Sequence, residues 1–366
     1  PLKGEGVAVG PHRGPYESCA WLRPGFRHGR NRRMAQRVAY GALAIAALIW
    51  LFLQDVVIAK QSTTLAGPLG DLLKRGSLIP LLFVAVLLRG AMELDRILRA
   101  KAVRPHTAFA YLMVVVLLLT PWLSAGGWLG SDVRDQEGLF WQLVALMATV
   151  LGAGVLCVLR RDPQGTFRDV GATLLMVFYL GFLGSFGLQL RCGRDIAREE
   201  GAWLLLIALL VTKSSDIGAY FVGSTLGRHK LIPSISPAKS VEGAVGGLLA
   251  SAAVAMLFAT AGSIAAAIGP GDGLLVTAIH DATRSFNIRN DSTSLAPLLR
   301  ACLFGVALSA AGQIGDLVES CFKRDSGVKD SGKVIPHYGG ILDLIDSPVF
   351  AMPVAWFLVT TVWNVV

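Results

Sequence analysis

Long apolar runs separated by short polar connections fill the chain from residue 38 to its end. Each run has about 18 or more residues and few charges, which is enough for a helix to cross a hydrocarbon core of about 30 Å. Within lipid the backbone must satisfy its own hydrogen bonds, so such runs have to be helices. The pattern predicts an all-α, polytopic membrane protein with about nine transmembrane helices. The predicted spans are residues 38–58, 78–94, 107–129, 139–159, 170–190, 202–222, 241–268, 295–314 and 340–366.

The composition favours the same class of protein. Hydrophobic residues make up 53% of the 366 residues and charged residues only 16%, whereas soluble domains contain about 25% charged residues. The five cysteines show no CxxC pair or regular spacing, so we expect neither a disulfide framework nor a zinc site. The net charge of +9 comes from basic residues in short connections, which is typical of topology signals and lipid-headgroup contacts. We therefore expect membrane lipids, and no nucleic acid, as partners.

The connections alternate between basic ones and acidic or mixed ones. The basic set contains Arg96, Arg99, Lys101 and Arg104, then Arg160, Arg161 and Arg168, then Arg228, Lys230 and Lys239, then Lys323, Arg324, Lys329 and Lys333. The opposite set contains Asp132, Asp135 and Glu137, then Asp195, Glu199 and Glu200. The positive-inside rule places the basic connections and the N-terminus in the cytosol. Nine spans would then place the C-terminus outside.

The first residues have a different character from the rest. Residues 1–36 are rich in Gly, Pro and Arg, and we expect a basic, disordered segment there. Met34 directly precedes the first apolar run and is a candidate for the true start. That run continues too far for the h-region of a cleaved signal peptide, so we expect a retained first span.

An ionisable group lies near the end of the span at 202–222. Asp216 has Lys213 and Tyr220 one helical turn to either side. Ionisable residues within a membrane are costly and by default functional, so Asp216 is a candidate site residue. The alternative is a Lys213–Asp216 pair that only neutralises itself.

The connection after that span ends in Ser-Pro-Ala-Lys-Ser, from Ser236 to Ser240, directly before the run that starts at residue 241. Hydroxyl and ammonium groups beside a helix N-terminus suit an anion, because free N–H groups and the helix dipole point at it. The alternative is an ordinary turn into the helix, followed by close packing of Gly243, Gly246 and Gly247. The sequence leaves both interpretations open.

Carboxylates gather on the last two predicted helices. Asp316, either Glu319 or Ser320, and Lys323 fall on one helical stripe, and Asp343 and Asp346 share a face of the last helix. Two helices can therefore aim carboxylates at a common point, with basic residues alongside. Without clustered His or Cys, this set suits Mg²⁺ carrying a phosphate substrate. An internal salt-bridge network and a proton or cation pathway are the alternatives.

Together these segments resemble the phosphatidate cytidylyltransferases, also called CDP-diacylglycerol synthases. The family's C-terminal signature is approximately S-x-x-K-R, four residues, K-D, a short spacer and P-G-H-G-G-x-x-D-R-x-D. The chain has Ser320-Cys-Phe-Lys323-Arg324, four residues, Lys329-Asp330, eight residues including Pro336, and Gly339-Gly340-Ile-Leu-Asp343-Leu-Ile-Asp346. The upstream motifs D-x-x-A-Y, S-P-x-K-[TS]-x-E-G and G-D-L-x-E-S match residues 216–220, 236–243 and 315–320. The resemblance covers roughly the last 150 residues.

The resemblance implies that CTP and phosphatidic acid react, with Mg²⁺ and an optional second cation, to give CDP-diacylglycerol and pyrophosphate. By matched position it implies a catalytic set of Asp316, Lys323, Asp343 and Asp346, in which the three aspartates bind the metal. The residues implied to bind phosphates are Ser236, Lys239, Ser240, Lys323, Arg324 and Lys329. Those implied to act in positioning are Asp216, Tyr220, Glu242, Glu319 and Asp330.

The resemblance also implies an organisation for the chain. Residues 37–200 would form N-terminal transmembrane helices and residues 201–366 a C-terminal catalytic transmembrane region. The site would face the cytosol, in a multi-pass protein of the bacterial inner membrane. Small-residue helix faces would allow a homodimer.

Two positions depart from the family pattern. Tyr338 stands where the family has histidine, with His337 one residue earlier, and Leu344 stands where it has arginine. The missing arginine removes a charge-assisted contact to a phosphate or carboxylate. A CTP-dependent enzyme for another lipid phosphate, or a lipid kinase, is therefore a near alternative. Two alternatives come from other classes of protein. One is an ion- or proton-coupled transporter, which would spread polar residues over several span centres, and the other is a catalytically silent scaffold.

Overall fold

The computed structural model describes residues 43, 45–59, 61–62, 67, 70, 73–74, 76–125, 128–129, 137–161, 163–192, 198–268, 296–328, 331–332 and 339–362, without the side chains of 137, 198–200, 262–268 and 296. The chain divides into two compact units, residues 1–49 and 50–366. An apolar helix, Ile45–Ala59, is the first described element. Every element that follows it belongs to the second unit.

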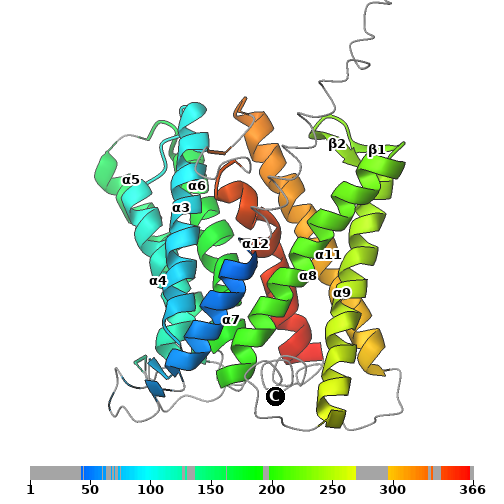
Figure 1. Ribbon diagram of the computed structural model, residues 1–366. Helices are drawn as coiled ribbons and strands as arrows, with labels where there is room; N and C mark the ends of the chain where they lie inside the picture. The colour runs from blue at the N-terminus through cyan, green and yellow to red at the C-terminus, as the bar shows by residue number, and fades with distance from the viewer. Residues whose placement is uncertain are drawn as a thin grey trace, which may run out of the picture. The chain divides into compact units, whose positions relative to one another are not determined.

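Helices make up nearly all of the second unit (Figure 1). In chain order the elements are α3 (Leu78–Ala100), α4 (Thr107–Ala125), α5 (Glu137–Arg160), α6 (Thr166–Met176), the π-helical η3 (Val177–Phe182), α7 (Leu183–Cys192), α8 (Arg198–Leu226), β1 (Lys230–Ile232), β2 (Ser236–Ser240), α9 (Val241–Ile268), α11 (Ala296–Asp325), α12 (Leu342–Phe357) and the π-helical η4 (Leu358–Val362). The two short strands pair antiparallel as a hairpin, with Lys230 opposite Ser240.

Seven helical stretches of the described chain are long and apolar enough to cross a membrane. They are Thr107–Ala125, Gly138–Arg160, Thr166–Cys192, Gly201–Leu226, Val241–Ala261, Pro297–Asp325 and Leu342–Val362. The prediction of an all-α, polytopic membrane protein is confirmed. The count of nine is not confirmed: α3 covers the predicted span 78–94 but carries Arg89, Glu93 and Asp95, and the span 38–58 is described only as the shorter helix Ile45–Ala59. The divisions predicted at residues 36 and 200 stay predictions.

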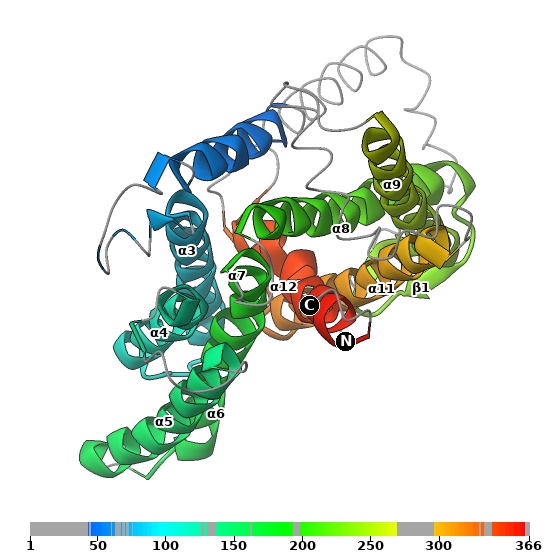
Figure 2. The same ribbon diagram turned by 90° about the horizontal axis from the view of Figure 1, so that it is seen from below.

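The helix α12 packs between two groups of helices. It packs against α7 and α3 on one side and against α8 and α11 on the other, and Figure 2 shows it between α7, α8 and α11. The helices α8, α9 and α11 pack against one another, while α3 and α4 pack against the continuous helix formed by α6, η3 and α7. Residues carried by α12 are therefore placed to meet residues from both halves of the chain.

The helices alternate in direction, so their connections fall at two ends (Figure 1). The C-terminal ends of α3, α5, α8 and α11 and the N-terminal ends of α4, α6, α9 and α12 lie at the upper end in that view, together with the hairpin. This upper end carries the basic connections around residues 96–104, 160–168, 228–239 and 323–324. The alternation of charge along the sequence thus corresponds to one basic end.

Small residues allow α8 and α9 to approach closely just below the hairpin. A Cβ atom on Gly243 would lie 2.9 Å from the carbonyl oxygen of Ala219, and one on Gly246 would lie 2.5 Å from the Val222 side chain. Neither contact leaves room for a side chain, so these glycines serve helix packing, as one of the two sequence interpretations proposed.

Candidate functional site

Three carboxylates converge where α11 and α12 cross near the upper end. Asp316 and Glu319 lie one turn apart on α11, Asp346 lies on α12, and an oxygen of each lies within 4.8 Å of the other two. Glu319 is fully buried and Asp346 is 4% exposed. The helices come this close because residue 315 is glycine, since a Cβ there would press on the carbonyl oxygen of Asp346. We call Asp316, Glu319 and Asp346 the three-carboxylate cluster.

Two lysines reach the cluster from opposite sides. Lys239, at the end of the hairpin, places its Nζ 2.6 Å from Asp316 Oδ2. Lys323, one turn after Glu319 on α11, contacts the Glu319 carboxylate and lies 2.6 Å from Asp343 Oδ1. The hairpin and both long helices are therefore held together by charge at this point.

A third lysine approaches from α8. Lys213 Nζ lies 2.9 Å from Asp216 Oδ2, which is the pair considered from the sequence, and the Ser347 hydroxyl donates to Asp216 Oδ1 at 3.4 Å. With these groups the network is complete for the described residues. We call it the site network: Lys213, Asp216, Lys239, Asp316, Glu319, Lys323, Asp343 and Asp346. Its five carboxylates exceed its three lysines by two negative charges.

The three-carboxylate cluster fits a divalent cation. Buried carboxylates so close together repel each other and lose hydration unless a cation compensates them. The Glu319 Oε1 atom is buried and accepts no hydrogen bond from any residue that the structure describes. Carboxylate oxygens are the ligands preferred by hard divalent cations such as Mg²⁺. The surplus of two negative charges matches the charge of one such ion.

Asp343, which the sequence grouped with the metal ligands, is satisfied by other donors. Its Oδ2 accepts from the Gly340 N–H at 2.7 Å and from the Ser331 hydroxyl at 2.8 Å, and its Oδ1 accepts from Lys323 Nζ at 2.6 Å. Gly339 has φ of +99°, a backbone conformation that favours glycine. The structure thus brings Asp316 and Asp346 together with Glu319, and Asp343 orients Lys323 beside them.

Glu93 on α3 joins the site from the N-terminal half of the chain, where the sequence predicted only spans. It is fully buried, and its Oε2 accepts from the Leu342 N–H at 2.9 Å and lies 3.2 Å from Ser331 Oγ, whose single proton it shares with Asp343. Arg89 NH2 lies 3.3 Å from its Oε1. Glu93 therefore caps the first turn of α12 and supports Asp343 through Ser331. Its place as an ionisable residue inside a predicted span was the signal that could have identified it.

The hairpin residues divide between site and scaffold. Ser240 Oγ accepts from the Gly243 N–H at 3.1 Å, which makes Ser240 the N-cap of α9. Glu242 accepts from the backbone N–H groups of Arg228 and His229, so it closes the hairpin. Ser236 lies in β2, while Arg324 Nε donates to the carbonyl of Ile235 at 3.1 Å. Only Lys239 of the hairpin contacts the three-carboxylate cluster among these residues.

The remaining predicted residues lie elsewhere. Tyr220 is 56% exposed and its ring packs on Phe221. Leu344, at the arginine position of the family pattern, is 41% exposed on α12. Lys329 and Asp330, and the histidine position Tyr338, lie outside the described residues.

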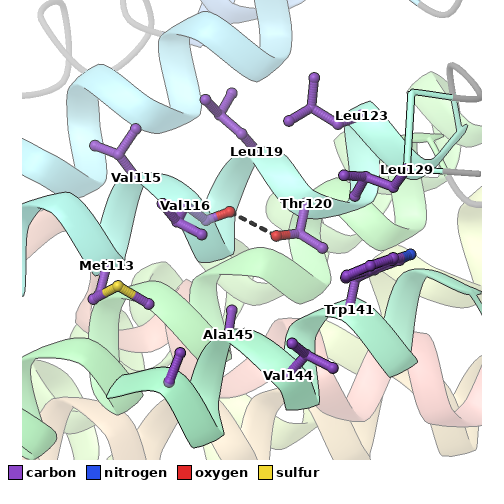
Figure 3. Close-up of a pocket in the computed structure, with 11 residues that line it drawn as sticks. Met113, Val115, Val116, Leu119, Thr120, Leu123, Leu129, Trp141, Val144 and Ala145 are labelled. Carbon is purple, nitrogen blue, oxygen red and sulfur yellow. Dashed lines mark hydrogen bonds between the residues drawn. The ribbon is translucent and has the colours of Figure 1, made fainter. Parts of the chain in front are cut away.

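A groove between α4 and α5 has a different character (Figure 3). Its volume is about 300 Å³, and its lining includes Leu119, Trp141 and Val144. The hydroxyl of Thr120 in its wall donates to the Val116 carbonyl at 2.7 Å. Because none of the described residues that line this groove is charged, it does not suit a phosphate group.

Comparison with known proteins agrees with the motifs. The chain matches the cytidylyltransferase family over residues 69–362. A phosphatidate cytidylyltransferase from Bacillus subtilis (strain 168) is 30% identical over 327 residues, which cover 89% of this chain and 97% of that protein. Those from Staphylococcus saprophyticus and Staphylococcus aureus (strain COL) are 32% identical over 282 and 279 residues, covering 77% and 75% of this chain and 90% and 92% of theirs. The family match includes α3, so it reaches far beyond the C-terminal motifs.

Proposed function

The chain belongs to the cytidylyltransferase family, and on this premise we propose that it is a phosphatidate cytidylyltransferase, which makes CDP-diacylglycerol and pyrophosphate from CTP and phosphatidic acid. The observation that carries the proposal is the three-carboxylate cluster, with two surplus negative charges and Lys239 and Lys323 at its sides. This arrangement suits a triphosphate that arrives with a divalent cation.

In the proposed reaction an oxygen of the lipid phosphate attacks the α-phosphorus of CTP. A P–O bond forms there, while the bond from the α-phosphorus to the oxygen shared with the β-phosphate breaks. Pyrophosphate leaves with the electron pair of that bond. No covalent intermediate with the protein is needed, so the residues contribute positioning and charge neutralisation.

We assign the cation to Asp316, Glu319 and Asp346 and propose Mg²⁺ as the ion. The bound ion would neutralise charge on the triphosphate during transfer. Asp343, held by donors from Lys323, Ser331 and Gly340, fits the task of fixing Lys323 toward the cluster. Direct metal binding by Asp343 and a second cation both stay predictions.

The phosphate-binding groups would come from the hairpin and the end of α11. Lys239 now pairs with Asp316, and a cation on Asp316 would free its ammonium group for a phosphate oxygen. Lys323, Arg324 and Ser236 border the same end of the bundle, whereas the Ser240 hydroxyl is already engaged as a helix cap. Lys329 remains a predicted phosphate ligand.

We propose that the end carrying the site network faces the cytosol of a bacterial cell, with the protein in the inner membrane. The basic connections lie at this end, and basic connections are retained on the cytosolic side. CTP would reach the site from the cytosol, and phosphatidic acid would enter laterally from the bilayer. A homodimer stays a prediction.

The test is an assay of the purified protein with labelled CTP, phosphatidic acid and Mg²⁺, in which CDP-diacylglycerol and pyrophosphate should form in equal amounts. A parallel reaction with lysophosphatidic acid tests the alternative of another lipid phosphate as substrate. A parallel reaction with diacylglycerol tests the alternative of a lipid kinase. A CDP-lipid from another acidic lipid alone would correct the substrate. Failure to form any CDP-lipid would overturn the proposal.

Two variants separate the candidate cation ligands. We expect Glu319→Gln to raise the Mg²⁺ concentration needed for half-maximal activity about ten-fold or more, and Asp343→Asn to lower the maximal rate with a smaller change in that concentration. Asp325→Asn is the matched control, because Asp325 is an exposed carboxylate on the same helix, and among the described residues it pairs with Lys101 at 3.4 Å. If Asp343→Asn instead shifted the Mg²⁺ concentration and Glu319→Gln lowered only the maximal rate, Asp343 would be a metal ligand and Glu319 would not.

A further inference from the structure

The hydroxyl group of Tyr179 is a buried donor that the C-terminal motifs do not explain. Tyr179 lies in η3, the π-helical segment between α6 and α7, and is 2% exposed. Its hydroxyl oxygen makes no hydrogen bond with any residue that the structure describes. Buried polar groups almost always have a partner, and π-helical segments occur frequently at functional sites. The group therefore calls for a partner that is not part of the described chain.

The neighbours of Tyr179 place its side chain against the two helices of the site. Its ring packs edge-on against Phe322, with ring centroids 5.9 Å apart, and against Phe350 at 5.8 Å. Phe322 follows Glu319 by one turn on α11, and Phe350 follows Asp346 by one turn on α12. The charges of all three members of the three-carboxylate cluster act on the Tyr179 hydroxyl. The Tyr179 side chain thus lies beside the turns of α11 and α12 that carry the cluster, and its hydroxyl donates to none of the cluster's oxygens.

We propose that the Tyr179 hydroxyl donates a hydrogen bond to an oxygen ligand of the cation held by the three-carboxylate cluster, either a water or a phosphate oxygen of the nucleotide. The inference rests on the proposed function for the identity of the nucleotide. A buried donor beside a group of acceptors, yet bonded to none of them, is placed to bind something that lies between them. Water and phosphate oxygen are both acceptors of the right chemistry for a phenol.

This assignment gives the N-terminal helices a direct part in the site. Glu93 acts on α12 through backbone and hydroxyl contacts, whereas Tyr179 would touch the bound ligand itself. The π-helical turn shifts the residues of α6 and α7 relative to a regular helix, and Tyr179 sits inside that turn. A regular α-helix through residues 177–182 would change the direction of the Tyr179 side chain relative to α7.

The test compares Tyr179→Phe with Tyr111→Phe. Phenylalanine keeps the ring packing and removes only the hydroxyl. Tyr111 is the matched control because its hydroxyl donates to Asp95 at 3.2 Å on α3 and α4, outside the site network. Three quantities are measured on each full-length protein in detergent: Mn²⁺ affinity by electron paramagnetic resonance, CTP affinity in the presence of Mn²⁺, and the melting temperature of the metal-free protein.

We expect Tyr179→Phe to weaken binding about ten- to one hundred-fold, as observed when groups that support metal ligands are removed. Weaker Mn²⁺ binding without nucleotide identifies a water as the partner, and weaker CTP binding alone identifies a phosphate oxygen. The metal-free melting temperature should stay or rise, because an unpaired buried group is removed. Tyr111→Phe should leave both affinities unchanged.

The proposal is overturned if both affinities of Tyr179→Phe equal those of the unsubstituted protein. It is also overturned if the metal-free protein melts at a lower temperature, since the hydroxyl would then have a structural partner. The Mn²⁺ titration needs no turnover. If the unsubstituted protein makes no CDP-lipid, the proposed function fails, while the cation arm still decides the role of Tyr179.

Discussion

Buried charges occur at both ends of the helices within residues 50–366, and the two groups differ in how completely their charges are paired. Beside the start of α3 and the end of α7, which lie at the lower end in Figure 1, Asp55 and Arg191 form a fully buried ion pair, with Arg191 NH2 2.7 Å and Nε 3.0 Å from Asp55 Oδ2. The other oxygen, Oδ1, accepts from the Leu78 N–H at 2.8 Å and the Ile79 N–H at 3.3 Å, at the start of α3. Each Asp55 oxygen has at least two donors, and the pair is neutral.

At the upper end the site network has two more carboxylates than lysines among the described residues, and both Glu319 and Tyr179 keep polar atoms without hydrogen bonds. Glu319 and Asp346 are about as buried as Asp55 and Arg191, so burial alone does not distinguish a structural charge from a functional one. The distinction is the completeness of pairing, because an uncompensated buried charge is costly unless a ligand completes it. The lower pair fixes the fold, and the upper network is built to receive a cation.

The largest effect is expected from Asp346→Asn in the upper network. Asparagine keeps the size of the side chain and removes its charge, so activity should fall about a thousand-fold or more, because several kcal/mol of charge stabilisation are lost. The metal-free melting temperature should stay or rise, since the repulsion within the three-carboxylate cluster is relieved. Steady-state formation of CDP-diacylglycerol and thermal melting measure the two effects.

The same substitution on the exposed Asp325 serves as the control for Asp346→Asn and should change neither quantity. Full activity in Asp346→Asn would show that the surplus charge of the upper network is not catalytic. Incomplete pairing of charges would then not indicate a functional site in this protein.

Removing Arg191 at the lower end should have the opposite pattern of effects, a loss of stability with unchanged activity. Arg191→Met leaves Asp55 buried without its cation, and the free energy of unfolding should fall by about 3 kcal/mol or more. Activity per folded molecule should be unchanged, which denaturation in detergent together with the CTP assay would check. The double variant Asp55→Asn/Arg191→Met should recover part of the stability, because no unpaired charge remains. Loss of activity at unchanged stability would contradict a purely structural role.

Much of the fold could be predicted because hydrophobicity along a chain is a local property. The apolar runs at 107–129, 139–159 and 241–268 correspond to α4, α5 and α9. The predicted span 295–314 is shorter than the observed helix, because α11 continues to Asp325 after the sequence becomes charged. Hydropathy detects where apolar residues stop, whereas a helix ends only where its backbone hydrogen bonds stop. The π-helical register of η3 depends on those bonds too and has no hydropathy signal.

The site was predictable to the extent that its residues lie within one motif or one helix. Helical spacing placed Asp316 and Lys323 on one stripe of α11 with either Glu319 or Ser320 between them, and the structure brings Glu319 to the cluster. Which carboxylate of α12 meets that stripe depends on packing between helices, and spacing could not choose between Asp343 and Asp346. Glu93 is separated from its partner Leu342 by 249 residues, so no local pattern relates the two.

Glu93 also provides a sharper test of the upper end, because it is a support for the network and not a member of it. Glu93→Gln keeps an acceptor for the Leu342 N–H but loses the charge opposite Arg89, and we expect activity to fall about ten- to one hundred-fold. The Mg²⁺ dependence should shift in parallel, which a loss of folded protein alone would not cause. Activity measured against Mg²⁺ concentration separates these outcomes.

Asp95→Asn is the matched control for Glu93→Gln, since Asp95 lies two residues further along α3 and pairs with Arg99 at 2.9 Å and with Tyr111. This variant should leave the Mg²⁺ dependence unchanged. An equal shift in both variants would mean that any charge on α3 influences the site.

The smallest effect is expected from Trp122→Phe at the lower end. The indole Nε1–H donates to the Gly76 carbonyl at 2.9 Å, and Gly76 has φ of +79° and lies directly against the Asp55–Arg191 pair. Removing this one bond should lower the free energy of unfolding by about 1 kcal/mol, the net value of a single neutral hydrogen bond. Denaturation in detergent measures the loss, and kcat and the Mg²⁺ dependence should stay the same. A change in either kinetic quantity would show that the two ends are coupled through α4 and α7, and that pairing at the lower end also serves the site.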